Sequence, residues 1–276
     1  MRTLSLIIAL TTGIPALAES PATAPTDSAM SIAQSGPSEL VQEVKAVSDR
    51  NATVQFGYPE NLKSGCSYSA TWKTGDYTAE IWFSKNFTGS KANLTTVGGK
   101  GFRIDWDMQV YGFLHQVGLY DLSIEADSIK ENAKASYSHE LNDITGGGGY
   151  TGFYGWLGDV GKPDAVEFYI NENWAGGPIN MSDCVKMGSI EVDGGTYEIY
   201  TRPRKGNRFV QWWSNRTTPR TSGEISYAKH IQAWLKLGMP NGSLVRLTFC
   251  LEVKWGHPSS GSVVYKTFAI DKPSAR

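Results

Sequence analysis

The segment Ala165-Val-Glu-Phe-Tyr-Ile-Asn171 indicates the type of fold, because its side chains alternate over the length of a typical strand. Period-two geometry places Glu167 and Tyr169 on one face and the apolar Val166 and Phe168 on the other. A glutamate among apolar strand neighbours is costly to bury unless it lines a cleft or has a partner. The segment therefore predicts a β-strand that presents a chemical group on one face.

Similar alternation recurs along the chain, separated by Gly-rich or Asp/Gly turns. The other predicted strands include Tyr77–Phe83, Tyr197–Tyr200, Leu247–Lys254 and Ser262–Phe268, and the turns include Gly146–Gly149 and Asp193–Gly195. One segment differs, because Ser226 can cap a helix with apolar residues at helical spacing, which Gly238 and Pro240 end. Many strands and one helix predict a two-sheet antiparallel sandwich, concave on one side.

Two segments fit this pattern less well. Residues 38–49 carry Leu40, Val41, Val44 and Val47 at helical spacing, which favours one short helix. Residues 103–133 mix apolar and charged residues, and we interpret them as an insertion into the sandwich.

The composition excludes several classes of protein. The 276 residues contain 26 Lys and Arg against 27 Asp and Glu, which gives a net charge of −1 and a pI of about 6.4. A nucleic-acid partner usually requires clustered basic residues and a basic pI, so none is expected. The 30 glycines and 12% aromatic residues suit twisted strands and a face that stacks on a flat, polar ligand.

The N-terminus predicts export. A basic start at Arg2, the apolar run Leu4–Leu10 and the small residues Ala16 and Ala18 are typical of a secretory signal peptide, which we assign to residues 1–18. No later segment has the roughly 18 unbroken apolar residues that a transmembrane helix needs, so no membrane association is expected. The mature protein is therefore predicted to be secreted and extracellular.

The remaining chain divides into two parts. Residues 19–53 form a Ser/Pro/Ala-rich arm or linker, and residues 54–276 form one domain, expected to be a monomer. Cys66, Cys184 and Cys250 allow at most one disulfide, and the sequence leaves open which two would pair. Six Asn-x-Ser/Thr sequons agree with export, although the motif is short. They lie at Asn51, Asn86, Asn93, Asn180, Asn215 and Asn241.

Two glutamates are the candidate catalytic residues. Glu252 lies between Leu251 and Val253 in an apolar strand, as Glu167 does in its own. Taken alone, each could instead pair with a nearby Lys or Arg. The four histidines show no spacing typical of metal ligands, so no metal site is expected.

The motifs around these glutamates resemble, in order, those of glycoside hydrolase family 11 endo-β-1,4-xylanases. Val97–Phe102 is similar to the family's glycine-lysine-glycine-tryptophan turn, Tyr154–Trp156 with Val166–Tyr169 to its nucleophile strand, Asp193–Tyr200 to "DGGTYDIY", Gln211–Arg216 to "QYWSVR", His230–Trp234 to "HVNAW", and Glu252 with Ser259–Ser262 to its acid/base strand and following loop. The likeness covers approximately residues 66 to 270.

The resemblance implies an all-β fold: a β-jelly roll of two packed, curved antiparallel sheets with one short α-helix. It implies retaining hydrolysis of xylan or a related β-1,4-glycan, with no cofactor and with the polysaccharide as partner. Glu167 would be the nucleophile and Glu252 the acid/base, about 5–5.5 Å apart. The substrate-binding residues implied by the resemblance are Tyr154, Tyr169, Trp72, Trp156 and Arg216, although the Trp156 indole could equally belong to the core.

The chain also departs from the family. Thr201–Val210 replaces a longer loop, the thumb, whose Pro-Ser-Ile tip covers the cleft in the family, and Arg246 stands where the family has a sugar-binding tyrosine. These changes suggest altered specificity, with acidic substituents able to pair with Arg246, or weakened catalysis. A second hypothesis is therefore a xylanase-like carbohydrate-binding or interaction protein with little or no turnover. A reducing-sugar assay on xylan discriminates the two.

Overall fold

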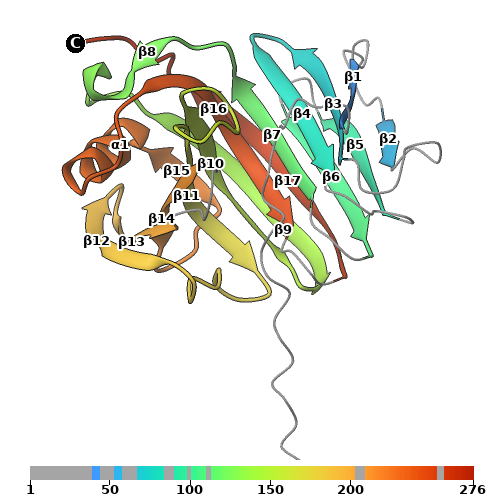
Figure 1. Ribbon diagram of the computed structural model, residues 1–276. Coiled ribbons are helices and arrows are strands. Elements are labelled where there is room, and N and C mark those ends of the chain that lie inside the picture. The colour runs from blue at the N-terminus through green and yellow to red at the C-terminus, as the bar shows by residue number, and fades with distance from the viewer. Residues whose placement is uncertain are drawn as a thin grey trace, which may run out of the picture.

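The computed structural model describes residues 39–43, 53–57, 67–83, 90–97, 101–109, 113–202, 209–253 and 258–276. These residues form two stacked β-sheets and one α-helix (Figure 1), which confirms the two-sheet fold predicted from the sequence. The predicted signal peptide, Cys66 and residues 203–208 of the shortened thumb lie outside the described residues.

The larger sheet has eleven strands. In spatial order they are β1 (Glu39–Glu43), β3 (Ser67–Thr74), β4 (Tyr77–Phe83), β7 (Phe113–Leu119), β16 (Ser243–Val253), β10 (Gly149–Leu157), β11 (Val166–Ala175), β14 (Val210–Arg216), β13 (Gly195–Arg202) and β12 (Val185–Val192), and β8 (Ile124–Glu125) pairs with β16. Among the described pairs, β1 with β3 and β11 with β14 run parallel, whereas the others are antiparallel as predicted.

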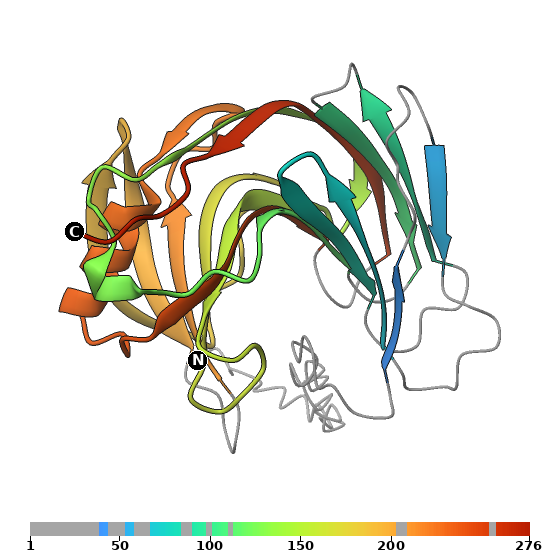
Figure 2. The same cartoon turned by 90° about the horizontal axis from the view of Figure 1, so that it is seen from above.

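The smaller sheet has six strands and covers the larger one. Its order is β15 (Ser222–Ile225), β9 (Ala135–Gly146), β17 (Ser259–Ile270), β6 (Gly101–Met108), β5 (Lys91–Val97) and β2 (Thr53–Gly57). Figure 2 shows both sheets curving together into an arch, with the larger sheet on the inside. The larger sheet therefore has one face toward the core and a second, concave face.

The core lies between the sheets and follows the alternation of the strands. On β6, Phe102, Ile104, Trp106 and Met108 are buried, and the polar residues between them are only half-buried. The concave face of the larger sheet carries a separate cluster that includes Tyr150, Tyr154, Trp156, Tyr169 and Trp213. Strands β10 and β11 are accordingly buried on both faces for most of their length.

A glycine is needed within the aromatic motif on β10. A Cβ at Gly155 would lie 2.2 Å from the Phe168 ring and 2.4 Å from the carbonyl oxygen of Arg246 on β16. Since such contacts are far inside van der Waals distance, only glycine lets the neighbouring groups approach this closely between Tyr154 and Trp156.

The helix α1 (Tyr227–Lys236) lies where the sequence predicts it, with Tyr227, Ile231 and Trp234 buried. Its cap differs from the prediction, because the Ser226 hydroxyl donates to Asp193 Oδ1 (2.6 Å) and makes no capping bond to the helix. Instead, Asp193 Oδ2 accepts the Ser226 N–H at 2.7 Å, so the β12–β13 turn places a carboxylate at the positive end of the helix.

Two interpretations of the sequence are wrong. Residues Glu39–Glu43 form the strand β1, which pairs with β3, and not the start of a helix. A short helix is marginal by itself, whereas the sheet edge satisfies the backbone of these residues. Residues 103–133 are no insertion, because β6 lies inside the smaller sheet and β7 between β4 and β16. The mixture of apolar and charged residues in this segment is that of β-strands such as β6, which has one buried apolar face and one polar face.

His115 makes folding stability dependent on pH. Its ring lies in the core beside Trp72 and Phe102, and neither nitrogen has a hydrogen-bond partner among the described residues. Burial lowers the pKa of His115 to about 3, compared with about 6.5 in the unfolded chain. The unfolded chain therefore binds more protons between these values, and stability present above pH 6.5 is lost progressively as the pH falls toward 3.

We expect His115→Leu to remove this loss. The free energy of unfolding of the variant minus that of wild type should be roughly 2 kcal/mol larger at pH 5 than at pH 8, since each pKa unit corresponds to about 1.4 kcal/mol. Urea unfolding at both pH values measures the difference. If the substitution changes the free energy of unfolding equally at pH 5 and pH 8, His115 takes up no proton when the protein unfolds.

Candidate active site

Glu167 is buried on the concave face and is held by three donors from three strands. Tyr154 on β10 donates its hydroxyl to Glu167 Oε1 at 2.9 Å, and Tyr169, two residues along β11, donates to the same oxygen at 3.2 Å. Gln211 Nε2 on β14 donates to Glu167 Oε2. Hydrogen bonds to a carboxylate favour its charged form, so these donors orient Glu167 and stabilise its negative charge.

Gln211 reaches Glu167 because β11 and β14 are parallel neighbours in register. Glu167 pairs directly with Gln211, and Tyr169 with Trp213. The Tyr169 and Trp213 rings stack at 3.9 Å with an interplanar angle of 6°. The parallel register therefore places a donor and an aromatic support beside Glu167 at once.

Glu252 is buried on β16, on the other side of β10 from Glu167. It pairs with Tyr150 of β10, and the Tyr150 hydroxyl hydrogen-bonds the Glu252 carboxylate. Burial, then the charge of Glu252 and this hydrogen bond, raise the pKa of Tyr150 well above its usual value. The charges of both glutamates also raise the pKa of Tyr169, after the larger effect of burial. The two carboxylates thus act on the same tyrosines.

Trp156 belongs to this group on the concave face. Its indole N–H donates to the Tyr154 hydroxyl, which in turn donates to Glu167, and its ring lies 4.7 Å from that of Phe209 in an edge-on contact. Trp156 is fully buried, so it acts through this hydrogen bond, which holds the Tyr154 hydroxyl in place. The structure therefore brings Glu167, Tyr154, Tyr169 and Trp156 together, with Glu252 across β10.

Trp72 is not brought to this group. It lies in the core between the sheets, near the His115 ring, and pairs with Ala79 on β4. Side chains on β4 alternate, so Trp82 is the tryptophan of this strand pair that lies in the concave-face cluster. The expectation that Trp72 stacks on a sugar ring from this face therefore does not fit its position.

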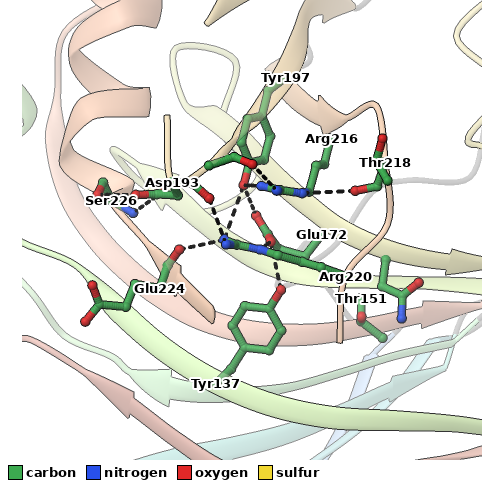
Figure 3. A network of polar contacts seen from close by, with 12 residues as sticks. Tyr137, Thr151, Glu172, Asp193, Tyr197, Arg216, Thr218, Arg220, Glu224 and Ser226 are labelled. Atoms are coloured by element: carbon green, nitrogen blue, oxygen red, sulfur yellow. Dashed lines mark hydrogen bonds and ion pairs between the residues drawn. The ribbon is translucent and has the colours of Figure 1, made fainter. Parts of the chain in front are cut away.

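Arg216 also lies away from Glu167, in the polar network of Figure 3. Its guanidinium donates to the Tyr197 hydroxyl (2.8 Å) and to the carbonyl oxygens of Gly194 (2.9 Å) and Thr218 (3.0 Å), and it packs over the Tyr197 ring. Alternation along β14 explains the difference, since Gln211 faces Glu167 and Arg216 is five residues on. Its contacts are those of a structural arginine.

Arg246 is on the concave face with an acidic partner. Its guanidinium lies 3.1 Å from Glu80 Oε2 and 4.4 Å from the centre of the Tyr120 ring, and Gln116 and Tyr120 also donate to Glu80. Glu80 therefore offsets the positive charge that we expected to attract acidic substituents. The ion pair leaves Arg246 as a hydrogen-bonding residue with little net local charge.

Gln211 and Tyr150 are the site residues that sequence reasoning did not assign. Gln211 stands in a quoted motif, but its role depends on a parallel pairing that no local pattern shows. Tyr150 could have been found, because Tyr150, Tyr154 and Trp156 fall at even spacing on one strand and share a face.

Other sequence expectations meet the structure as follows. Cys184 and Cys250 are both free thiols, so they do not pair with each other. Among the described residues, no group of three or more His, Cys, Asp and Glu side chains could hold a metal ion. No helix in the described part of the chain is long and apolar enough to span a membrane.

The concave face of this curved β-sandwich carries Glu167 and Glu252 among tyrosines and tryptophans. Such paired carboxyl groups are what glycoside hydrolases use on a sugar chain, so the fold and site match this enzyme class. The family model of glycosyl hydrolases family 11 matches residues 74–265. The chain belongs to this family.

Individual relatives agree with this assignment. The chain is 32% identical over 193 residues to endo-1,4-beta-xylanase A of Bacillus pumilus, covering 67% of this chain and 77% of that protein. It is 30% identical to endo-1,4-beta-xylanase S20 of Neocallimastix patriciarum, covering 78% of this chain and 66% of that protein. The solved structure of the family 11 xylanase from Neocallimastix patriciarum matches the fold with a TM-score of 0.63 at 22% identity, covering 81% of this chain and all of that one.

Proposed function

We propose that the protein is a secreted, retaining endo-β-1,4-xylanase acting on xylan or a related β-1,4-glycan. The observation that carries the proposal is the placement of Glu167 and Glu252 on strands flanking β10, on the face that bears the aromatic cluster. The xylanase relatives support the substrate class. The apolar N-terminal run at Leu4–Leu10 supports export.

In the first step, a Glu167 oxygen forms a bond to the anomeric carbon while the glycosidic carbon–oxygen bond breaks. Glu252 gives its proton to the departing oxygen, so the leaving chain departs as a neutral alcohol. Tyr154, Tyr169 and Gln211 fix the attacking carboxylate in one orientation. This preorganisation means that little reorganisation is needed when the bond forms.

In the second step, Glu252 takes a proton from water, which attacks the same carbon and releases Glu167. Glu252 must therefore alternate between its protonated and ionised forms. Its burial acts against a permanent charge in the free enzyme, and the charges of both glutamates act on the same residue, Tyr169. The covalent ester on Glu167 carries no charge, which favours ionisation of Glu252 at the stage where a base is required.

Glu252→Gln tests the assignment. We expect hydrolysis of xylan to fall by about 10³-fold or more, while an aryl xylobioside with a good leaving group keeps far more activity, because it needs no proton donor in the first step. Reducing-sugar and chromophore release measure the two rates, and Glu140→Gln, on the smaller sheet, serves as the matched control. Equal losses on both substrates would contradict a proton-donor role.

The binding-protein hypothesis is tested by the same preparation. If wild type binds xylohexaose in calorimetry but releases no reducing sugar from xylan, the chain is a carbohydrate-binding protein and the hydrolase proposal fails. Where a sugar-binding tyrosine is expected, the described structure instead has Arg246, paired with Glu80 on the concave face.

A further inference from the structure

Arg202 on β13 is a largely buried arginine next to the residues that hold Glu167, and no step of the proposed mechanism uses it. It pairs directly with Gln211 in the antiparallel register of β13 and β14. Its Nη1 lies 3.5 Å from Gln211 Oε1, while Gln211 Nε2 donates to Glu167. The Gln211 amide therefore connects the guanidinium to the carboxylate of the proposed nucleophile.

Three further contacts hold the Arg202 guanidinium in place. Its Nη2 lies 2.7 Å from Asp183 Oδ1, its Nε donates to Cys184 Sγ at 3.3 Å, and its Cζ lies 5.8 Å from the centre of the Trp213 ring. Asp183 and Cys184 belong to the segment between β11 and β12. Because a planar guanidinium held on several sides keeps one orientation, Nη1 stays directed at Gln211.

The guanidinium decides which end of the Gln211 amide meets Glu167. A glutamine amide has a donor end and an acceptor end, whereas arginine has only donors and an ionised carboxylate only acceptors. Arg202 therefore favours Oε1 on its own side, which directs Nε2 to Glu167. The 3.5 Å contact is longer than the usual range of roughly 2.7–3.2 Å, so the guanidinium acts mainly through its positive charge on the amide oxygen.

Asp183 is the acidic partner that the structure describes for Arg202. Glu198 lies two pairs of residues away on the same face of β13, but it is paired with Lys186 at 2.6 Å and accepts the Tyr200 hydroxyl at 2.7 Å. The Asp183 side chain is about half exposed, whereas that of Arg202 is 12% exposed. The ion pair thus joins a surface segment to the support of Glu167.

We propose that Arg202, held by Asp183, is a positioning residue that orients the Gln211 amide and, through it, the Glu167 carboxylate. This role rests on the proposed hydrolase function, because it concerns the bond that Glu167 forms to the anomeric carbon. Arg202 acts on the attacking oxygens only through Gln211. Its loss therefore misdirects the nucleophile, and a small misplacement of a reacting group lowers turnover more than affinity.

Arg202→Met keeps much of the length of the side chain and removes its charge. On xylohexaose we expect kcat to fall about tenfold while KM changes less than about twofold. Asp183→Asn, which loosens Arg202 from a half-exposed position, should lower kcat about threefold. Arg202→Lys keeps the charge and should retain more kcat than Arg202→Met. The matched control is Asp105→Asn, which breaks a 2.6 Å ion pair with Arg103 on β6 of the smaller sheet and should change neither constant.

A double-mutant cycle separates positioning from a general structural role. In a Gln211→Ala background, Arg202→Met should cause less than about a twofold further loss of kcat, because the amide through which it acts is absent. An undiminished loss in that background overturns the inference, and so does equal kcat in Arg202→Lys and Arg202→Met. A rise in KM at unchanged kcat also overturns it, since Arg202 would then bind the sugar chain directly.

The two proposals can fail separately. If wild type hydrolyses xylan and Arg202→Met retains its kcat, only the positioning role is wrong. If wild type does not hydrolyse xylan, the side-chain amide signal of Gln211 in NMR spectra, identified by its absence in Gln211→Ala, decides the matter. Faster exchange of this amide with solvent in Arg202→Met and Asp183→Asn, but not in Asp105→Asn, supports the orienting role, and unchanged exchange overturns it.

Discussion

Glu167→Gln should remove hydrolysis of xylan, lowering kcat by about 10³-fold or more while the protein stays folded. An amide has nearly the same shape as a carboxylate but is a poor nucleophile, so the glycosyl ester cannot form at a useful rate. The Tyr154 and Tyr169 hydroxyls that donate to Glu167 can also accept from the new amide. Initial rates on xylan, with thermal unfolding as the check on folding, measure the effect.

A covalent label gives an independent readout of the same assignment. A 2-fluoro-xylobioside with a good leaving group should glycosylate wild type once per molecule, and peptide mass spectrometry should place the label on Glu167. Glu252→Gln should still be labelled, whereas Glu167→Gln should not. A label on any other residue of a catalytically active protein would refute the role of Glu167.

Local alternation was sufficient to predict many of the strands. Tyr77–Phe83 is β4 as predicted, and the segment around Glu167 is part of β11, because each has a buried face that fixes the period of two. The helix was predicted from its spacing and its stop at Gly238, whose φ of +98° suits glycine. β6 was missed although its alternation is regular, because its polar positions carry charges that suggested a surface insertion.

The site was only partly predictable, because strand pairing decides which face a residue occupies. The expectation that Glu167 and Tyr169 share a face needs only the period of two, and it is correct. To place Trp72, one must know which face of β3 meets the core. To place Gln211, one must know that its strand runs parallel to the strand of Glu167, which lies 44 residues away in the sequence. A single sequence carries neither kind of information in its local pattern.

A bulge on β11 shows how pairing overrides the local pattern. Thr151 pairs with Asn173 and Gly152 with Asn171, so Glu172 is an extra residue without a partner on β10. Glu172 and Asn173 then both reach toward the smaller sheet, the first to Tyr137 and the second to His139. The bulge thereby re-aims Trp174 toward the concave face, where it packs against the aromatic cluster.

Glu172 is the second glutamate of β11, and we expect it to control stability instead of turnover. It is fully buried and accepts from Tyr137 (2.7 Å), Tyr197 and Arg220, as Figure 3 shows. Tyr137 belongs to β9, so the carboxylate links the two sheets. Removing one partner of such a group leaves an uncompensated charge, here on Arg220, in a poorly solvated position.

Glu172→Gln keeps the size of the side chain and removes only its charge. We expect a loss of about 3 kcal/mol of unfolding free energy, or roughly 6–12 °C in Tm for a chain of this size. The control is Glu140→Gln, whose partner Lys266 and own side chain are both about half exposed, so its loss should stay below about 1 kcal/mol. Urea unfolding of both variants makes the comparison.

We therefore expect the two glutamates of β11 to divide chemistry from folding within one strand. Glu167 faces the concave side and Glu172, five residues on, faces the smaller sheet, so Glu172→Gln should keep the kcat of wild type at temperatures where it is folded. Replacing Glu172 and Arg220 together by leucine should recover part of the lost stability, because no unpaired charge remains. If Glu172→Gln lowers kcat in the folded protein as strongly as Glu167→Gln does, the division of roles by strand face is wrong, and the network must also position the catalytic carboxylate.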